Sequence, residues 1–184
     1  MKHPETFFDG KTGKLTGKNT SIIVRKLKDV SGIFENQSAL EAMDLEQIAY
    51  EVEMHNSVGE IEDGMQFGTS YLYPGKVGDE YFMTKGHFHA IRSRPEYYWC
   101  IKGEGVLLLM DESRHSWSEK VTVGSLHYIP GYVAHRLINT GKEVLTVGAC
   151  WPSDAGHDYD TIANEGFSLK VKDQNGDIAL VTTK

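Results

Sequence analysis

Two histidines separated by one residue, a nearby carboxylate and a distant third histidine form the group with the clearest potential for chemistry. His87 and His89 flank Phe88, Glu96 follows seven residues after His89, and His135 lies far downstream. Residues two apart in a strand point to the same side, so both imidazoles are expected to face the interior, opposite Glu96 on the next strand. Three imidazoles and one carboxylate suit Fe²⁺, Mn²⁺, Ni²⁺ or Zn²⁺, whereas Ca²⁺ and Mg²⁺ prefer oxygen ligands. We therefore predict one divalent metal ion on these four side chains, and the room left for substrate favours Fe²⁺ or Mn²⁺ over Zn²⁺.

The spacing of the glycines around these ligands resembles the two-part signature of the cupins. The first part runs from Gly86 to Gly103 and the second from Gly124 to Asn139, with Pro130 and His135 inside it. This resemblance implies an all-β, single-domain cupin over residues 1–184, a double-stranded β-helix or jelly-roll barrel, with the metal-binding core at about residues 45–152. In the alternative interpretation, the histidines of a cupin-like barrel only hydrogen-bond one another.

Alternation of apolar and polar residues with a period of two is the main structural signal. It is clearest from Ile48 to Met54, and it predicts a strand with one apolar face. Other strands are predicted at Met65–Tyr73, Tyr81–Thr84, Glu96–Ile101, Val106–Met110, Lys120–Val123, Leu126–Ile129, Arg136–Asn139, Val144–Cys150, Phe167–Lys172 and Ile178–Thr182. Asn175-Gly176 predicts a hairpin between the last two. Short helices are expected at Ser38–Asp44, from the capping-box spacing of Ser38 and Glu41, and near Tyr159–Asn164.

Composition narrows the classes of partner. A net charge of −7 opposes binding to nucleic acid, whose phosphates need a basic surface. The longest strongly apolar run, Val106–Met110, is far too short to span a membrane, and the first residues lack the apolar core of a signal peptide. Cys100 and Cys150 are expected to be buried, reduced thiols in a cytoplasmic protein.

Three longer blocks resemble one cupin family, the cupin-type glucose-6-phosphate isomerases. The blocks are Pro74 to His89, Pro130 to Arg136 with Tyr132 where other cupins have glycine, and Pro152 to Tyr159. The resemblance covers roughly residues 45–170. It implies interconversion of glucose 6-phosphate and fructose 6-phosphate in a homodimer, with iron as the metal and with His87, His89, Glu96 and His135 as ligands.

The same resemblance implies a set of substrate-binding residues. The phosphate-binding positions of the family correspond to Ser70, Thr84, Gly86 and Trp151, and His157 and Tyr159 correspond to residues lining the cavity. Trp151 stands where the family often has tyrosine, so it offers an indole N–H in place of a hydroxyl. Tyr98, two residues after Glu96, is expected on the same strand face and within reach of sugar hydroxyls. Lys85 and Arg92 are further candidates to neutralise phosphate, and His127 is expected to be a hydrogen-bonded core histidine.

Two routes for the isomerisation remain open at this stage. Glu96 is the candidate catalytic base of an enediol route, in which a proton leaves C2 and returns to C1. In the other route a metal ion polarises the carbonyl and a hydride moves directly. Two other functions also remain open, since a metal-dependent cupin dioxygenase or decarboxylase uses the same ligands, and a sugar-binding cupin need not be an enzyme.

Overall fold

A computed structural model describes residues 1–56 and 61–183 of the chain, and β-strands are its main secondary structure. The largest sheet has six strands in the order β11-β8-β13-β5-β4-β3, and all of its neighbouring strands are antiparallel. In that order the strands are β11 (Leu126–Ile129), β8 (Glu96–Lys102), β13 (Leu145–Pro152), β5 (Met65–Leu72), β4 (Ile48–His55) and β3 (Thr20–Lys26). The expected all-β class is confirmed.

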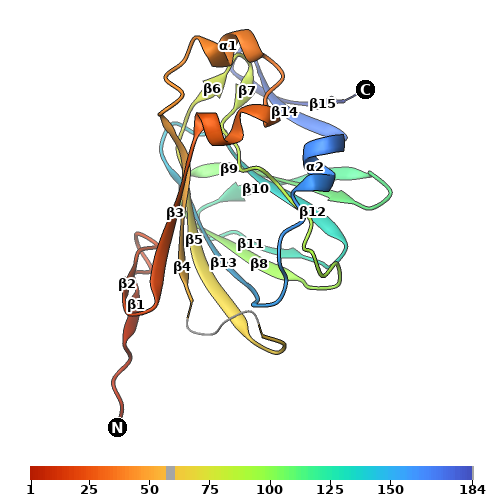
Figure 1. Cartoon of the computed structure of the whole chain (residues 1–184). Helices are drawn as coiled ribbons and strands as arrows, with labels where there is room; N and C mark the ends of the chain where they lie inside the picture. Colours follow the sequence, from red (N-terminus) through yellow and green to blue (C-terminus); the bar gives the residue numbers. More distant parts are fainter. Residues whose placement is uncertain (57–60, 184) are drawn as a thin grey trace.

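Smaller sheets complete the structure (Figure 1). A three-stranded sheet contains β10 (Ser116–Thr122), β9 (Glu104–Asp111) and β12 (Val133–Asn139). A four-stranded sheet contains β15 (Asp177–Thr182), β14 (Leu169–Gln174), β7 (Glu80–Tyr81) and β6 (Lys76–Val77), and a hairpin contains β1 (Thr6–Phe8) and β2 (Leu15–Gly17). The helices are the 3₁₀ helix η1 (Leu27–Ile33), α1 (Gln37–Glu41) and α2 (Asp160–Glu165). Among the described residues, no helix is long and apolar enough to cross a membrane.

The hydrophobic core lies between the large sheet and the three-stranded sheet. Leu107, Leu108, Leu109 and Met110 of β9 are all at most 1% exposed, so neither side of this strand faces solvent. A strand covered on both faces reads as a continuous apolar run, which is why Val106–Met110 lacks the alternation seen elsewhere. In the large sheet, residues still alternate between the inner and the outer face. The residues on its inner face line a cavity beside the predicted metal ligands.

Most strand predictions agree with the structure, and the exceptions have local causes. Tyr81–Thr84 is not one strand, because β7 ends at Tyr81 and only Met83 continues, through a single bridge to Ile138. β10 begins at Ser116, earlier than expected. The first expected helix is shifted as well, since Asn36 and not Ser38 caps α1 by accepting a hydrogen bond from the Ala39 N–H at 2.9 Å. The Asn175-Gly176 hairpin and the second helix are confirmed.

Candidate metal centre

Three separate parts of the fold bring the predicted ligands together. His87 and His89 lie in the segment between β7 and β8, Glu96 is the first residue of β8, and His135 lies in β12. The backbone N–H of His135 donates to the His87 carbonyl at 3.0 Å, which ties the segment to β12. One potential ligand atom from each of the four side chains lies within 4.8 Å of the others.

The segment that carries His87 and His89 differs from the expected regular strand. His87 pairs with His135 on one side, but the next residue, Phe88, pairs with Asp158 on the other. Gly86, just before them, has a φ of +72°, which interrupts extended backbone. The segment therefore forms isolated bridges, although both imidazoles still reach the same group of ligands.

The ring nitrogens of this group fit a metal ion. His87 Nε2 and His135 Nδ1 are buried and have no hydrogen-bond partner among the described residues, and His135 Nε2 has the Glu96 carboxylate as its near neighbour but no well-aligned hydrogen bond. His135 Nε2 lies 3.0 Å and His89 Nε2 lies 3.3 Å from Glu96 Oε2. Nitrogen and oxygen ligands sit about 2.1 Å from a transition-metal ion, so opposite ligands are roughly 4.2 Å apart. Ligands at right angles are about 3.0 Å apart, close to the two distances to Glu96, and the 4.8 Å limit on the whole group is only slightly wider than the separation of opposite ligands. Buried nitrogens without partners are costly unless something binds them.

A backbone contact orients the imidazole of His89. Its Nδ1 lies 2.7 Å from the Arg94 carbonyl oxygen, which can only accept, so Nδ1 carries the proton. This tautomer leaves the Nε2 lone pair directed at the ligand group, the usual arrangement for a metal-binding histidine. Arg94 is held in turn by Asp154, with Nε donating to Oδ1 at 2.9 Å.

Burial and mutual charge set the protonation of the group. Burial, reinforced by the neighbouring histidines, lowers the pKa of His87 well below its ordinary value. Burial also works against the charged form of His89, but the Glu96 carboxylate outweighs it and raises the pKa of His89. Burial alone would raise the pKa of Glu96, yet the contacts with His135 and His89 lower it. Glu96 is therefore a carboxylate at neutral pH and His87 is a neutral ligand.

A cavity of about 120 Å³ opens directly from the ligand group. The inner face of the large sheet supplies its lining at every second residue: Ile23 and Arg25, Tyr50, Val52 and Met54, Gly68 and Ser70, Glu96 and Tyr98, Ala149 and Trp151. The segment of residues 84–89, His135, His157 and Tyr159 complete the lining. The cavity thus brings together the four predicted metal ligands and the predicted substrate-binding residues, but not Arg92.

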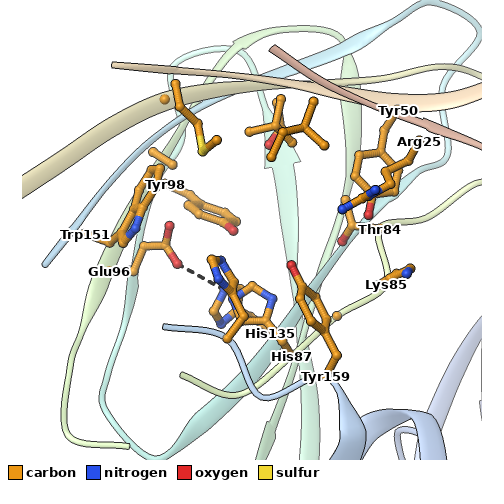
Figure 2. A pocket seen from close by; sticks show the side chains of 18 of the residues that line it. Arg25, Tyr50, Thr84, Lys85, His87, Glu96, Tyr98, His135, Trp151 and Tyr159 are labelled. Atoms are coloured by element: carbon orange, nitrogen blue, oxygen red, sulfur yellow. Dashed lines mark ion pairs between the residues drawn. The ribbon is translucent and has the colours of Figure 1, made fainter. Parts of the chain in front are cut away.

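The substrate-binding candidates occupy different sides of this cavity (Figure 2). Thr84 and Lys85 lie together on one side, while Trp151 lies beside Glu96 on the other. Thr84 Oγ1 accepts a hydrogen bond from the Leu137 N–H at 3.1 Å, which leaves its O–H free to donate to a ligand. Tyr98, 9% exposed, packs its ring edge-on against His135 at 5.6 Å between centroids.

His157 and Tyr159 form an aromatic wall over the ligand group. Their rings stack with an interplanar angle of 2° and a centroid distance of 5.4 Å. Both contact the His87 ring, at 4.5 and 5.3 Å between centroids. Burial raises the pKa of Tyr159 to about 12, so its hydroxyl stays protonated and can donate a hydrogen bond.

Two cavity residues, Arg25 and Tyr50, were not found from the sequence. Figure 2 shows their side chains together above Thr84. Burial raises the pKa of Tyr50, although the backbone N–H of Lys85 and the Arg25 guanidinium act in the opposite direction. Tyr50 could have been found from its hydroxyl, which is a polar group on the apolar face of the strand predicted from Ile48 to Met54. Arg25 lies in β3, which was not predicted as a strand.

Two other candidates lie outside the cavity lining. Arg92 pairs with Asp158 and lies over the Phe88 ring, 4.4 Å from its centroid, so its charge is already used in the structure. His127, 4% exposed, lies 2.6 Å from Glu119 Oε2 and 2.8 Å from Ser125 Oγ, which confirms a hydrogen-bonded core histidine. Cys100 and Cys150 are both unpaired, and Cys100 is the more buried.

A family model and two relatives that match most of this chain carry the same description. The family model described as glucose-6-phosphate isomerase (GPI) matches residues 24–181. A glucose-6-phosphate isomerase of Thermococcus litoralis is 40% identical over 185 residues, covering 98% of this chain and 96% of that protein. The corresponding protein of Pyrococcus horikoshii is 43% identical over 161 residues, covering 86% and 85%. Among solved structures, oxalate decarboxylase from Bacillus subtilis at pH 4.6 is 19% identical with a TM-score of 0.49, covering 65% of this chain and 29% of that chain.

Proposed function

Because this chain belongs to the glucose-6-phosphate isomerase family, we propose that it interconverts glucose 6-phosphate and fructose 6-phosphate with a bound divalent metal ion. The ligands in this proposal are His87, His89, Glu96 and His135, whose convergence beside a cavity lined with polar side chains is the observation that carries it. Their nitrogen-rich set favours Fe²⁺ or Mn²⁺. Bound there, such an ion supplies Lewis-acid polarisation of the sugar's carbonyl and hydroxyl oxygens.

The phosphate of the sugar is placed at the end of the cavity formed by Thr84, Lys85 and Gly86. The Thr84 hydroxyl and the Gly86 N–H are the neutral donors there. Arg25 and Lys85 are the arginine and lysine of the cavity lining, and none of the ion pairs found among the described residues includes them. A phosphate dianion bound at this end would therefore meet two positive charges that no carboxylate already neutralises.

The remaining contacts are assigned from position. Ser70 faces the cavity from β5, and its predicted phosphate contact stays part of the proposal. Trp151 lies on the Glu96 side, so in this proposal its indole contacts the sugar end of the substrate. Tyr98, His157 and Tyr159 offer hydrogen bonds to sugar hydroxyls and exclude water from the reacting carbons.

For the hydrogen transfer, we favour the direct shift over the enediol. Glu96 lies close to two imidazoles, which lower its pKa and make it a weaker base. In the direct shift, the hydrogen on C2 moves to C1 with its electron pair, and a proton moves from O2 to O1, so no base needs to hold the C2 proton. Glucose 6-phosphate deuterated at C2 distinguishes the routes, because the shift keeps the label in the product and exchange of an enediol with solvent removes it.

The overall assignment is tested with purified protein. After reconstitution with Fe²⁺ or Mn²⁺, it should interconvert the two hexose phosphates in a coupled assay, and a chelator should abolish this. A flat assay after verified metal loading would refute the isomerase function. The assay should also include mannose 6-phosphate, since the cavity alone does not rank the epimers.

We also propose a homodimer in the cytoplasm. Tyr97 and Tyr128, on the outer face of the large sheet, are 48% and 52% exposed, and their ring centroids are 5.1 Å apart. Such an exposed aromatic pair suits burial against a second subunit. Sedimentation of the wild type and of Tyr97→Arg tests this: the variant should shift toward the monomer, and an unchanged dimer would remove this face from the interface.

A further inference from the structure

Arg136 is a buried cation that forms no ion pair with any carboxylate of the described residues; Glu80 is close enough to act on its charge but pairs directly with Lys170 instead. It follows His135 in β12, so the two side chains leave opposite faces of the strand. Arg136 is 5% exposed, and none of the ion pairs found within residues 1–56 and 61–183 includes it. Its Nη2 donates a hydrogen bond to the Lys85 carbonyl oxygen, and its Nε is buried without a partner. A buried guanidinium held by a single carbonyl is costly to keep, which calls for an explanation.

The guanidinium is in direct contact with the loop that carries the proposed phosphate donors. It lies over the Phe167 ring, 4.7 Å from the centroid, so this stacking fixes the plane of the guanidinium. A methyl group added at Gly86 would come within 2.9 Å of Arg136 Nε and 2.8 Å of Phe167 Cε2. The loop therefore rests on these two side chains with no intervening space.

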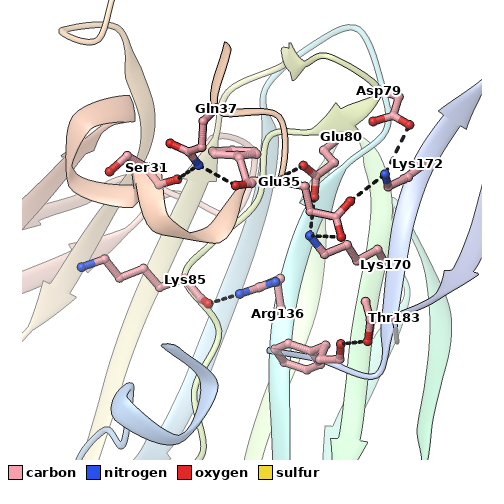
Figure 3. A network of polar contacts seen from close by, with 12 residues as sticks. Ser31, Glu35, Gln37, Asp79, Glu80, Lys85, Arg136, Lys170, Lys172 and Thr183 are labelled. Atoms are coloured by element: carbon pink, nitrogen blue, oxygen red, sulfur yellow. Dashed lines mark hydrogen bonds and ion pairs between the residues drawn. The ribbon is translucent and has the colours of Figure 1, made fainter. Parts of the chain in front are cut away.

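Arg136 reaches this loop from the side away from the ligand group. A second cavity, lined by Arg136 and Phe167, lies behind the loop, and Lys85, Gly86 and Tyr159 line both cavities. Figure 3 shows the Arg136 guanidinium directed at the Lys85 carbonyl. Arg136 does not line the cavity proposed to hold the sugar, so it acts through the loop.

One peptide plane connects Arg136 to the substrate. The Lys85 carbonyl and the Gly86 N–H belong to the same peptide unit, and no described peptide bond is cis. In a trans peptide these groups point in opposite directions. A donor that fixes the carbonyl on one side therefore fixes the direction of the N–H on the other, and it also polarises that N–H into a better donor.

We propose that Arg136 is a positioning residue for the substrate phosphate, which it serves by holding the Lys85–Gly86 peptide so that the Gly86 N–H faces the first cavity. The positive charge of Arg136 lies on the side of the loop away from the first cavity. A phosphate dianion bound in the first cavity would balance this charge. This inference rests on the proposed isomerase function and its phosphate site. It explains why an arginine with no ion-pair partner among the described residues is kept beside a predicted metal ligand.

The test separates phosphate binding from metal binding and from folding. In metal-loaded Arg136→Met, the KM for glucose 6-phosphate should rise roughly 10- to 100-fold, as expected for loss of a charged hydrogen bond, with kcat changed much less. Metal content should stay at the wild-type level. The affinity for inorganic phosphate, measured by calorimetry, should fall by the same factor. Arg114→Met is the matched control, since it removes an arginine paired with Glu165 but touches no loop residue of the site.

Further variants keep the inference testable if Arg136→Met does not fold. Arg136→Lys retains the charge but loses the planar stack, and Phe167→Leu loses the stack alone, so both should raise KM in the same direction by a smaller factor. An unchanged KM and phosphate affinity in a folded variant would overturn the inference, and so would a loss of metal at unchanged phosphate affinity. If the wild type binds phosphate but lacks isomerase activity, the proposed function fails while the phosphate titration still decides the role of Arg136.

Discussion

Replacing Gly86 by alanine tests the phosphate end of the cavity with a magnitude that follows from the structure. The φ of +72° at this position costs a residue with a Cβ about 1–2 kcal/mol. The new methyl would also lie 2.8 Å from Phe167, a ring that is 2% exposed and would have to shift, and overpacking of this kind costs about 1–3 kcal/mol. For a 184-residue chain at about 2–4 °C per kcal/mol, Gly86→Ala should lower Tm by roughly 10 °C.

Gly124→Ala is the matched control for this experiment. Gly124 has a similar φ of +84°, but nothing lies within 4 Å of an added methyl group. It should lose only the backbone contribution, roughly 4 °C in Tm, and keep its KM. Gly86→Ala should in addition raise the KM for glucose 6-phosphate about tenfold or more, because the displaced N–H no longer meets the phosphate. Equal Tm losses in the two variants, or an unchanged KM in Gly86→Ala, would refute the reasoning.

Three further predictions address other parts of the site. His135→Ala should hold well below one metal ion per chain, measured by elemental analysis, whereas His127→Ala should keep its metal; full occupancy in the first variant would remove His135 from the ligand set. Arg25→Met should raise KM for glucose 6-phosphate about tenfold or more and change kcat little, and steady-state kinetics with unaltered KM would exclude Arg25 from phosphate binding. Hydrogen bonds from Thr161 and the ion pair with Arg92 lower the pKa of Asp158 to about 2, below its ordinary 3.8. The contacts of the ionised Asp158 therefore stabilise the fold fully above about pH 4, and this stabilisation disappears as the pH falls toward 2. Asp158→Asn should lower Tm at pH 7 and match the Tm of the wild type near pH 2. A difference in Tm that stays constant with pH would contradict this.

The sequence predicted the ligand group because its spacing reflects simple geometry. His87 and His89 are two residues apart, Glu96 begins the next strand, and the second cupin block places His135 opposite. The same period of two predicted Tyr98 on the Glu96 side of its strand, and Tyr98 does line the cavity. Glu96, Tyr98 and His135 can be found from sequence because each depends on the alternation within its own strand, and His87 and His89 keep a common direction although their segment is not a regular strand.

The parts that the sequence missed depend on contacts between distant segments. Arg25 enters the cavity because β3 pairs with β4 at the far side of the large sheet, and a charged residue within an apolar stretch gave no sign of this. Arg136 was included in a predicted strand, but its carbonyl partner on Lys85 lies 51 residues away. The isolated bridges around His87 likewise depend on distant segments, since His87 pairs with His135 and Phe88 pairs with Asp158.

Anomalous diffraction from crystals loaded with Mn²⁺ and fructose 6-phosphate would test the proposed metal site and its substrate most directly. We expect one strong peak within bonding distance of His87, His89, Glu96 and His135, with sugar oxygens next to it and the phosphate at Thr84 and Gly86. A peak at any other place, or a sugar phosphate bound away from those four side chains, would contradict it.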